Sequence, residues 1–523
     1  MNISSCLAAL GAAVALLWAP LAAATDSPAL YQTHCAACHG ADRLGLSGPA
    51  LLPENLDRLR RPEAEKVVRE GRIATQMQGF AYRLKPEEIR DLVQWIYSPV
   101  EPRPRWSEAD IRHSRVVHVK PGSLPDRPVF SADPLNLFVV VESGDHHVSV
   151  LDGDRLESLG RFPTRFALHG GPKFSPDGRY VYFGSRDGWV SKFDLWNLVT
   201  VAEIRAGINT RNVAVSGDGK WVLVGNSLPH SLVLLDADLN FVRSIETRDL
   251  AGKETSRVSA VYDASPRRSF VVALRDIPEI WEISYDPKAD PIYDGYVHDY
   301  KMGEGIAVPG FLNPRRTRLD DILDDFYFDD SYTHVLGATR PDASGKGRGQ
   351  VVNLDVRRKI ADLDISGMPH LGSGIAWNWK GRRVMATPNL KEGLISLIDT
   401  GTWQTVGQVA TLGPGFFLRS HEKSKVAFAD AMMSKEFKDT LVAIDKDRLE
   451  IVARLRPEPG KTFAHVEFTK DGRYALASLM ENDGALIVLD AHSLKEVKRL
   501  PMKKPIGKYN VWNKISRSEG TSH

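Results

Sequence analysis

The chain is poor in cysteine. Its 523 residues include three cysteines, and two of them, Cys35 and Cys38, lie close together. This count excludes a disulfide-rich scaffold and leaves no second cysteine pair to complete a zinc site. A large excess of charge of one sign is also lacking, since the formal net charge is +2. The balance argues against a nucleic-acid partner, while a 42% apolar content is enough for two cores.

Long hydrophobic runs are absent as well. The apolar run from Leu7 to Leu21 has about 15 residues, which is short for a membrane span. It ends in Ala22-Ala23-Ala24, a small-residue cleavage pattern, so we predict a signal peptide over residues 1–24. The run is not preceded by Lys or Arg, which leaves a membrane anchor as the alternative. Export predicts a periplasmic protein and removes Cys6, the third cysteine, from the mature chain.

Cys35, Cys38 and His39 form the pattern Cys-x-x-Cys-His. Each thiol of this pattern can add across a haem vinyl group, and the histidine is placed to ligate the iron. A zinc half-site and a redox dithiol use the same cysteine spacing and remain alternatives. The lack of any other cysteine in the exported chain favours covalent haem c, bound through Cys35 and Cys38, over both.

A second iron ligand is expected farther along the same small helical domain. Met77 is the methionine available before the linker near residue 99, and Gly71 and Gly79 flank it. A lone methionine is more often core filler, but here an apolar-periodic helix follows, with one face made by Ile89, Leu92, Val93 and Ile96. We predict His39 and Met77 as iron ligands. The stretch resembles a class I cytochrome c, an all-α domain over residues 25–105.

A repeating β-rich unit follows the proline-rich linker 99–104. Each unit has a turn, a β-rich run, a variable loop and an alternating strand that closes on aspartate. The closing residues are Asp152, Asp194, Asp236, Asp286, Asp355, Asp399, Asp445 and Asp490. Most are about 42 to 50 residues apart, the period of a four-stranded blade, so we predict an all-β eight-bladed propeller over residues 106–523. One wider step carries an insertion around 287–325, and long loops of this kind are often functional.

A haem c domain followed by an eight-bladed propeller resembles the cytochrome cd1 family, whose propeller holds haem d1 in its central channel. Several segments carry the resemblance further: Phe166–His169, Gly184–Asp187, Gly207–Arg211, Met368–Gly372 and Gly507–Val511. Together they cover nearly the whole exported chain. The resemblance implies non-covalent binding of haem d1, or of its dihydro precursor, inside the propeller.

By the same resemblance His169 is the proximal iron ligand of haem d1, and Arg186 and Arg211 face its carboxylates. The chemistry of these residues agrees, because a guanidinium group pairs bidentately with a carboxylate at a fixed charge. The glycines that follow His169 would let a planar ligand approach the backbone. Without the resemblance, ion pairs on the blade surface would explain both arginines.

The chain departs from the nitrite reductases of this family, which use two distal histidines to protonate nitrite. One survives as His370, whereas Asp324 stands at the position of the other. A carboxyl group has a reference pKa about two and a half units below that of imidazole and would repel an anionic substrate. This departure argues against nitrite reduction. It leaves His370 to ligate the iron of haem d1 on the distal side.

His465 appears where the reductases are not expected to have a histidine. A histidine satisfied at a strand start is the plain alternative, but the pattern resembles the branch of the family that converts a propionate of dihydro-haem d1 to an acrylate. That branch implies an oxidoreductase in which His465, with His370, forms the catalytic pair and His465 is the base. Which ring nitrogens carry protons is not fixed by the sequence.

The expected partners follow from this chemistry. Haem c would accept electrons singly and pass them to a soluble acceptor such as a small cytochrome c. A nitrite reductase is a candidate recipient of the finished haem d1. Two other functions stay open on the sequence: a nitrite reductase with an altered distal pocket, and a non-enzymatic carrier of haem d1.

Overall fold

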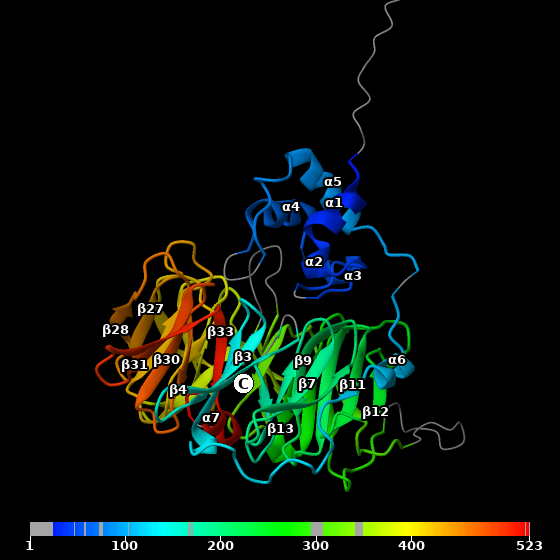
Figure 1. Ribbon diagram of the computed structural model, residues 1–523. Coiled ribbons are helices and arrows are strands. Elements are labelled where there is room, and N and C mark those ends of the chain that lie inside the picture. The colour runs from blue at the N-terminus through cyan, green and yellow to red at the C-terminus, as the bar shows by residue number, and fades with distance from the viewer. Residues whose placement is uncertain are drawn as a thin grey trace, which may run out of the picture.

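Figure 1 shows the computed structural model of the chain. It describes residues 25–46, 48–56, 59–72, 77–102, 104–165, 168, 171–293, 307–339, 349–517 and 519–521. The predicted signal peptide, residues 1–24, lies outside the described residues. Within the described ranges, no helix combines the length and apolar character that a membrane span needs.

The N-terminal part is helical and has its own core. Its helices are α1 Ser27–His34, α2 Ala36–His39, α3 Pro53–Leu56, α4 Arg61–Glu70 and α5 Pro86–Ile96, and α6 Glu108–His113 lies in the connection to the sheets. α5 is the predicted apolar-periodic helix, with Ile89, Leu92, Val93 and Ile96 all buried. Pro86 and the carboxylate of Glu88, which accepts the Lys85 N–H, set its start. The ring of Tyr31 on α1 lies 5.1 Å from that of Trp95 on α5 and closes this core.

The remaining strands form eight antiparallel sheets, the blades of the predicted propeller (Figure 1). Listed from the innermost strand outward, the blades are β33 Pro505–Asn510, β2 Leu137–Glu142, β3 His147–Asp152 and β4 Glu157–Pro163; β5 Lys173–Phe174, β6 Tyr180–Gly184, β7 Trp189–Asp194, β8 Val199–Arg205 and the added β1 Val116–Val117; β9 Asn209–Val215, β10 Trp221–Leu228, β11 Ser231–Asp236 and β12 Phe241–Glu246; β13 Val258–Ala264, β14 Ser269–Leu274, β15 Glu279–Ser284 and β16 Pro314–Arg318; β17 Asp325–Phe328, β18 His334–Ala338, β19 Gly349–Asn353 and β20 Arg358–Leu363; β21 Ile375–Trp379, β22 Arg382–Pro388, β23 Leu394–Asp399 and β24 Thr405–Ala410; β25 Leu418–Arg419, β26 Val426–Asp430, β27 Leu441–Asp445 and β28 Glu450–Leu455; β29 Phe463–Phe468, β30 Tyr474–Leu479, β31 Gly484–Asp490 and β32 Glu496–Met502.

The aspartate that recurs at the end of the third strand makes the turn that follows it. In the blade of β7, Asp194 Oδ1 accepts hydrogen bonds from the N–H groups of Trp196 and Asn197 at 2.9 and 3.3 Å. Leu198 then takes a φ of +52°. A carboxylate that binds the backbone two and three residues on stabilises such a turn locally, which is why the residue repeats with the blade.

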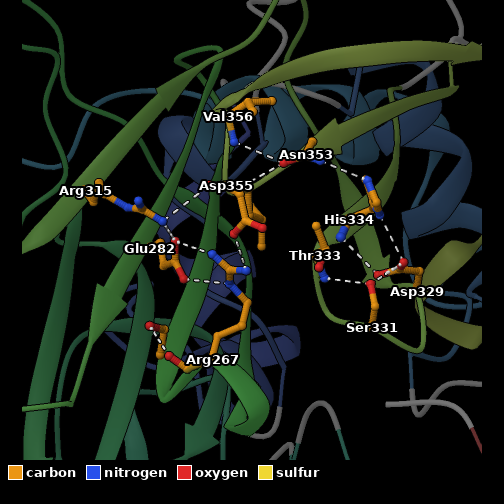
Figure 2. A network of polar contacts seen from close by, with 12 residues as sticks. Arg267, Glu282, Arg315, Asp329, Ser331, Thr333, His334, Asn353, Asp355 and Val356 are labelled. Atoms are coloured by element: carbon orange, nitrogen blue, oxygen red, sulfur yellow. Dashed lines mark hydrogen bonds and ion pairs between the residues drawn. The ribbon is translucent and has the colours of Figure 1, made fainter.

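Two of the predicted closing residues, Asp286 and Asp355, were wrong as members of this pattern, because their strands end two residues earlier. In the second case Asn353 makes the turn, accepting from the N–H groups of Asp355 and Val356 at 2.9 and 3.1 Å (Figure 2). Asp355 instead forms an ion pair with Arg267 from the neighbouring blade, at 2.7 Å. The count of eight blades is unaffected.

The last strand of the chain closes the ring. β33 pairs with β2 of the first blade, with Lys508 opposite Val140. Helix α7 (Val511–Ser516) follows and lies on the side of the propeller away from the helical domain (Figure 1). The predicted insertion falls mainly between β15 and β16, and residues 294–306 of it lie outside the described residues.

The helical domain packs on one face of the propeller (Figure 1). Buried Ala50 and Leu52 of the helical domain share one apolar cluster with Ile208 and Leu228 of the propeller, and Trp106 of the connection packs against it. Ile208 directly precedes the innermost strand β9, so the contact lies at the entrance to the channel.

Candidate functional site

The predicted haem c motif forms the end of α1 and the short helix α2. Cys35 is the N-cap of α2 and is buried, whereas Cys38 is exposed, and neither is in a disulfide. Residues three apart lie on one face of a helix, so both thiols project to the same side. Burial raises the pKa of Cys35 to about 11. Two thiols on one face with a histidine beside them are the donor set that covalent haem c requires.

The orientation of His39 fits an iron ligand. Its Nδ1 donates a hydrogen bond to the carbonyl oxygen of Pro49 at 2.8 Å, and this contact leaves the Nε2 lone pair available for a metal. Burial lowers the pKa of His39, which favours the neutral, ligating ring. Gly48 lies against the ring: a Cβ there would come within 2.6 Å of it.

Met77 is half-buried and packs against the same core as the haem motif. Its carbonyl oxygen accepts the N–H of Arg72 at 2.9 Å. Gly71 has a φ of +78°, and a Cβ there would lie 2.6 Å from the Met77 carbonyl oxygen, so this position requires glycine. Residues 73–76 of the same segment lie outside the described residues. Ligation of the iron by His39 and Met77 stays a prediction.

His370 lies at the start of the one-turn 3₁₀ helix Leu371–Ser373, just before the innermost strand β21. Its Nδ1 donates to the carbonyl oxygen of Phe416 at 2.8 Å, which again leaves Nε2 as the lone-pair nitrogen of the neutral ring. The Nε2 atom is 3.7 Å from Asp325 Oδ2, a carboxylate oxygen that also accepts the Gly372 N–H at 2.6 Å. The ring is therefore held by the two blades that flank it.

His465 is the bulged residue of β29. Ala464 pairs with Ser478 and Val466 with Ala477, so His465 has no partner in the ladder, and its φ is +52°. A bulge with a left-handed non-glycine residue redirects a side chain and is typical of functional positions. The ring is buried between Phe417 and Tyr509, with centroids at 4.5 and 5.2 Å. The catalytic role of His465 stays a prediction beside the plain alternative of a histidine satisfied at a strand start.

Arg186 and Arg211 lie close enough to act on each other electrostatically, together with Arg72 of the helical domain. Burial and then the charges of Arg211 and Arg72 lower the pKa of Arg186 to about 9. The Arg211 Nε donates to the Ser259 carbonyl oxygen at 2.8 Å, which fixes the direction of its side chain. Clustered, partly buried cations repel one another, and anions that join them offset this cost. The cluster is suited to a ligand with several carboxylates.

His169, the predicted proximal ligand, lies outside the described residues. The described residues on either side of it approach the site. Leu168 forms a bridge with Ser185, next to Arg186, and Gly171 lies against Tyr509, the ring that contacts His465.

Two functional candidates, Asp325 and Lys508, had not been predicted from the sequence. Asp324 is buried directly before β17, but the carboxylate beside His370 belongs to its neighbour, Asp325. Lys508 on β33 is fully buried and contacts the imidazole of His465. The adjacent pair Asp324-Asp325 and the terminal family segment containing Lys508 were both visible, but neither shows which side chain turns toward a histidine.

A cavity of about 660 Å³ opens at the other end of the innermost strands. β9 begins beside the helical domain at Asn209, and its last residues, Ala214 and Val215, line this cavity. Its charged and aromatic lining includes Lys173, Tyr262, Tyr327, Lys514 and Arg517. The described candidate haem d1 residues, Arg186, Arg211, His370 and His465, do not line this cavity. The candidate site therefore lies apart from it, around these four residues.

Known proteins resemble the chain over both parts. Residues 132–294 and 309–514 match the family model described as the cytochrome D1 heme domain, and residues 22–96 match that of the cbb3-type cytochrome c oxidase subunit III. Dihydro-heme d1 dehydrogenase of Pseudomonas aeruginosa is 55% identical over 517 residues, covering 98% of this chain and 99% of the relative. A solved structure, dihydro-heme d1 dehydrogenase NirN in complex with DHE, has a TM-score of 0.79 at 55% identity and covers 94% of this chain and 99% of its own.

More distant relatives carry other names. Nitrite reductase of Stutzerimonas stutzeri is 25% identical over 571 residues, covering 98% of this chain and 97% of the relative. Protein NirF of the same organism is 27% identical over 378 residues, covering 71% and 90%. The full-length similarity to a dehydrogenase is thus more than twice as strong in identity as that to a nitrite reductase.

Proposed function

The chain belongs to the cytochrome D1 haem domain family, and on this premise we propose that it is a dehydrogenase of haem d1 biosynthesis, which oxidises a propionate side chain of dihydro-haem d1 to an acrylate. The observation that carries the proposal is the bulged, buried His465, in a chain that also has the cluster of Arg186, Arg211 and Arg72 and a haem c motif. Neither a nitrite site nor a simple carrier calls for all three features.

Binding of the substrate falls to the cations and histidines of the channel. Arg186 and Arg211 pair with carboxylates of the tetrapyrrole, which offsets the cost of burying the two guanidinium groups together. His169 ligates the iron on the proximal side. His370 ligates it on the distal side through Nε2, since Nδ1 is engaged by Phe416.

The reaction removes two protons and two electrons from adjacent carbons of the propionate, and the acrylate double bond forms. Nε2 of His465 takes one proton, while the second passes to water. Burial, followed by the charges of Lys508, Lys514 and Arg419, holds the pKa of His465 well below its usual value, so the ring is neutral and able to accept a proton at neutral pH.

The electrons leave through the helical domain. Cys35, Cys38, His39 and Met77 would hold haem c, which when bound is a one-electron acceptor. The apolar contact of Ala50 and Leu52 with Ile208 and Leu228 keeps that domain against the channel entrance. A soluble one-electron carrier, such as a small cytochrome c in the periplasm, takes the electrons, and a nitrite reductase receives the finished haem d1.

Nitrite reduction fits the site less well. The carboxylate of Asp325 lies 3.7 Å from His370 Nε2, and a like charge close to the distal iron position would repel nitrite. Ligation of the iron by His370 would also occupy the position that nitrite needs. A distal pocket of this kind would fix the tetrapyrrole in place, so that a propionate side chain reacts and the iron does not.

The proposal is tested by removing the base. His465→Ala should lower turnover of dihydro-haem d1 by about 10²–10⁴-fold, the usual contribution of a positioned general base. Affinity should fall far less, because one lost hydrogen bond costs about 1–3 kcal/mol. Conversion is followed by the red-shifted absorption of the acrylate-conjugated product with an external electron acceptor present, and binding is followed by titration.

His334→Ala is the matched control. This imidazole lies in the outer network of one blade, bound to Asp329 and Asn353 (Figure 2), and its loss should leave both measurements unchanged. Near-normal conversion by His465→Ala would remove His465 from the mechanism. Stable binding without any conversion by the unmodified protein would make the chain a carrier instead.

A further inference from the structure

Lys508 lies directly behind His465. It is on β33 and has no exposed surface. Its Nζ donates to the carbonyl oxygen of His465 and to Ser478 Oγ at 2.8 Å, and lies 3.3 Å from Nδ1 of the His465 ring. One amine thus holds both the backbone of the bulge and the imidazole of the bulged residue.

The surroundings of this pair disfavour a charge on either group. Burial, together with the charge of Arg419 on β25, outweighs the charges of Glu467 on β29 and Asp430 on β26 and places the pKa of Lys508 well below its usual value. The charges that act on His465 come from Lys508, Lys514 on α7 and Arg419, all of which disfavour a cationic ring. The rings of Phe417 and Tyr509, which pack against His465, carry no charge at neutral pH.

An uncharged Lys508 matches its three contacts atom by atom. Its two N–H bonds serve the His465 carbonyl oxygen and Ser478 Oγ, and its lone pair accepts the Nδ1 hydrogen of His465. This arrangement leaves the Nε2 lone pair of the ring pointing away from Lys508. A protonated Lys508 would also have a partner for each N–H bond. Once Nδ1 of His465 has lost its hydrogen, the three acceptors are that nitrogen, the His465 carbonyl oxygen and Ser478 Oγ.

We propose that His465 and Lys508 form a proton relay, with Lys508 as the positioning residue behind the base. When Nε2 takes the proton from the substrate carbon, the Nδ1 hydrogen moves to Nζ, so the ring stays neutral and the charge rests on the amine. The broken C–H bond leaves its electron pair on the tetrapyrrole, and a haem c held by Cys35, Cys38 and His39 would supply the one-electron acceptor for the oxidation. The proton returns through the ring when the product leaves and water enters. The relay rests on the proposed function.

An amine is the stronger base of the two. The reference pKa of lysine is about four units above that of histidine, and this difference favours transfer of the proton onto Nζ. Lys508 also supports the strained backbone, because its contact to the carbonyl oxygen of His465 stabilises a left-handed non-glycine residue.

Lys508→Met tests the relay, because it keeps the length and apolar stem of the side chain and removes the amine. We expect the turnover number to fall about 10²-fold, while the dissociation constant for dihydro-haem d1 changes less than about threefold. The acidic limb of the rate profile should move to lower pH, because the amine that takes up the proton is gone and His465 alone, whose pKa lies well below its usual value, then sets the limb. A merely structural loss would lower the rate without moving that limb.

Lys192→Met is the matched control. Lys192 is a buried lysine on β7 that pairs with Asp238 at 2.8 Å, away from the histidines, and its replacement should leave rate, affinity and pH profile unchanged. An unshifted acidic limb in Lys508→Met, or a normal turnover number, would overturn the relay. Conversion by the unmodified protein is measured alongside, so that failure of the relay and failure of the proposed function give different results.

A second measurement does not depend on the variant folding. Nitrogen-15 NMR of histidine-labelled, reduced protein, with His465 assigned by comparison with His465→Gln, reports which ring nitrogen carries the hydrogen. The relay requires hydrogen on Nδ1 and none on Nε2 at neutral pH. Hydrogen on Nε2 would contradict it.

Discussion

At the scale of single residues, the ligand of haem c can be tested at Met77. The side chain is half-buried in the core that contains the haem motif, and its backbone is fixed against Arg72 and Gly71. Met77→Ala should abolish the near-infrared charge-transfer band of a sulfur-ligated ferric haem while leaving the covalent haem in place. Met433→Ala, at a position 52% exposed on the propeller, should leave the band intact. Its persistence in Met77→Ala would assign the sixth ligand to another residue.

Single residues also show where sequence reasoning stops. Cys35, Cys38 and His39 could be recognised because their chemistry depends on spacing along the chain. Lys508 and Asp325 could not, because each acquires its role from a partner across blades: Lys508 is 43 residues from His465, and Asp325 is 45 residues from His370. A buried lysine and a second aspartate in a pair carry no sequence signal for those contacts.

At the scale of elements, one buried ion pair ties α7 and the C-terminal segment to the blades. Arg419 on β25 donates to Glu467 on β29 at 2.6 Å and to the Gly520 carbonyl oxygen at 2.8 Å, and Asn513 on α7 donates to the same carboxylate at 2.8 Å. Arg419→Met should lower the free energy of unfolding by about 3–5 kcal/mol, because it leaves a buried carboxylate without its cation. Denaturant titration measures the loss.

The stability that the Arg419–Glu467 pair contributes decreases at low pH. Burial raises the pKa of Glu467, but the charge and hydrogen bonds of Arg419, with Lys514 and Asn513, bring it below its usual range. The stabilisation is therefore complete above a pH of about 4.3 and is lost as the pH falls further. Arg499→Met, which breaks a pair with Glu496 at the exposed surface, should change stability far less. Equal losses in the two variants would contradict the account.

The blades illustrate what an element's sequence can specify. The closing aspartate predicted eight repeats because a carboxylate makes the turn after the third strand, as Asp194 does. The same rule misplaced two strand ends, because Asn353 serves the turn as well as an aspartate would, and Asp355 follows it two residues later. The recurring turn residue therefore predicts the number of blades. The exact end of each third strand depends on which polar side chain accepts the hydrogen bonds of the turn.

At the scale of the whole molecule, the helical domain and the propeller form one reaction unit. Leu52 and Ile208 lie in a common apolar cluster, and the charge of Arg72 reaches Arg186 in the channel. The two domains could be predicted from the chain, but this contact could not, because nothing in either sequence pattern says which faces meet. The arrangement accounts for an electron-accepting domain on a propeller that binds a tetrapyrrole.

The central claim is that the chain oxidises dihydro-haem d1 with its own haem c as the first acceptor. The most direct test is an anaerobic single turnover with fully oxidised protein and no external acceptor, followed by absorption spectroscopy. Each acrylate formed releases two electrons and each haem c holds one, so we predict one acrylate-conjugated product for every two haem c groups reduced. Binding of dihydro-haem d1 with haem c remaining oxidised and no product band would contradict the account.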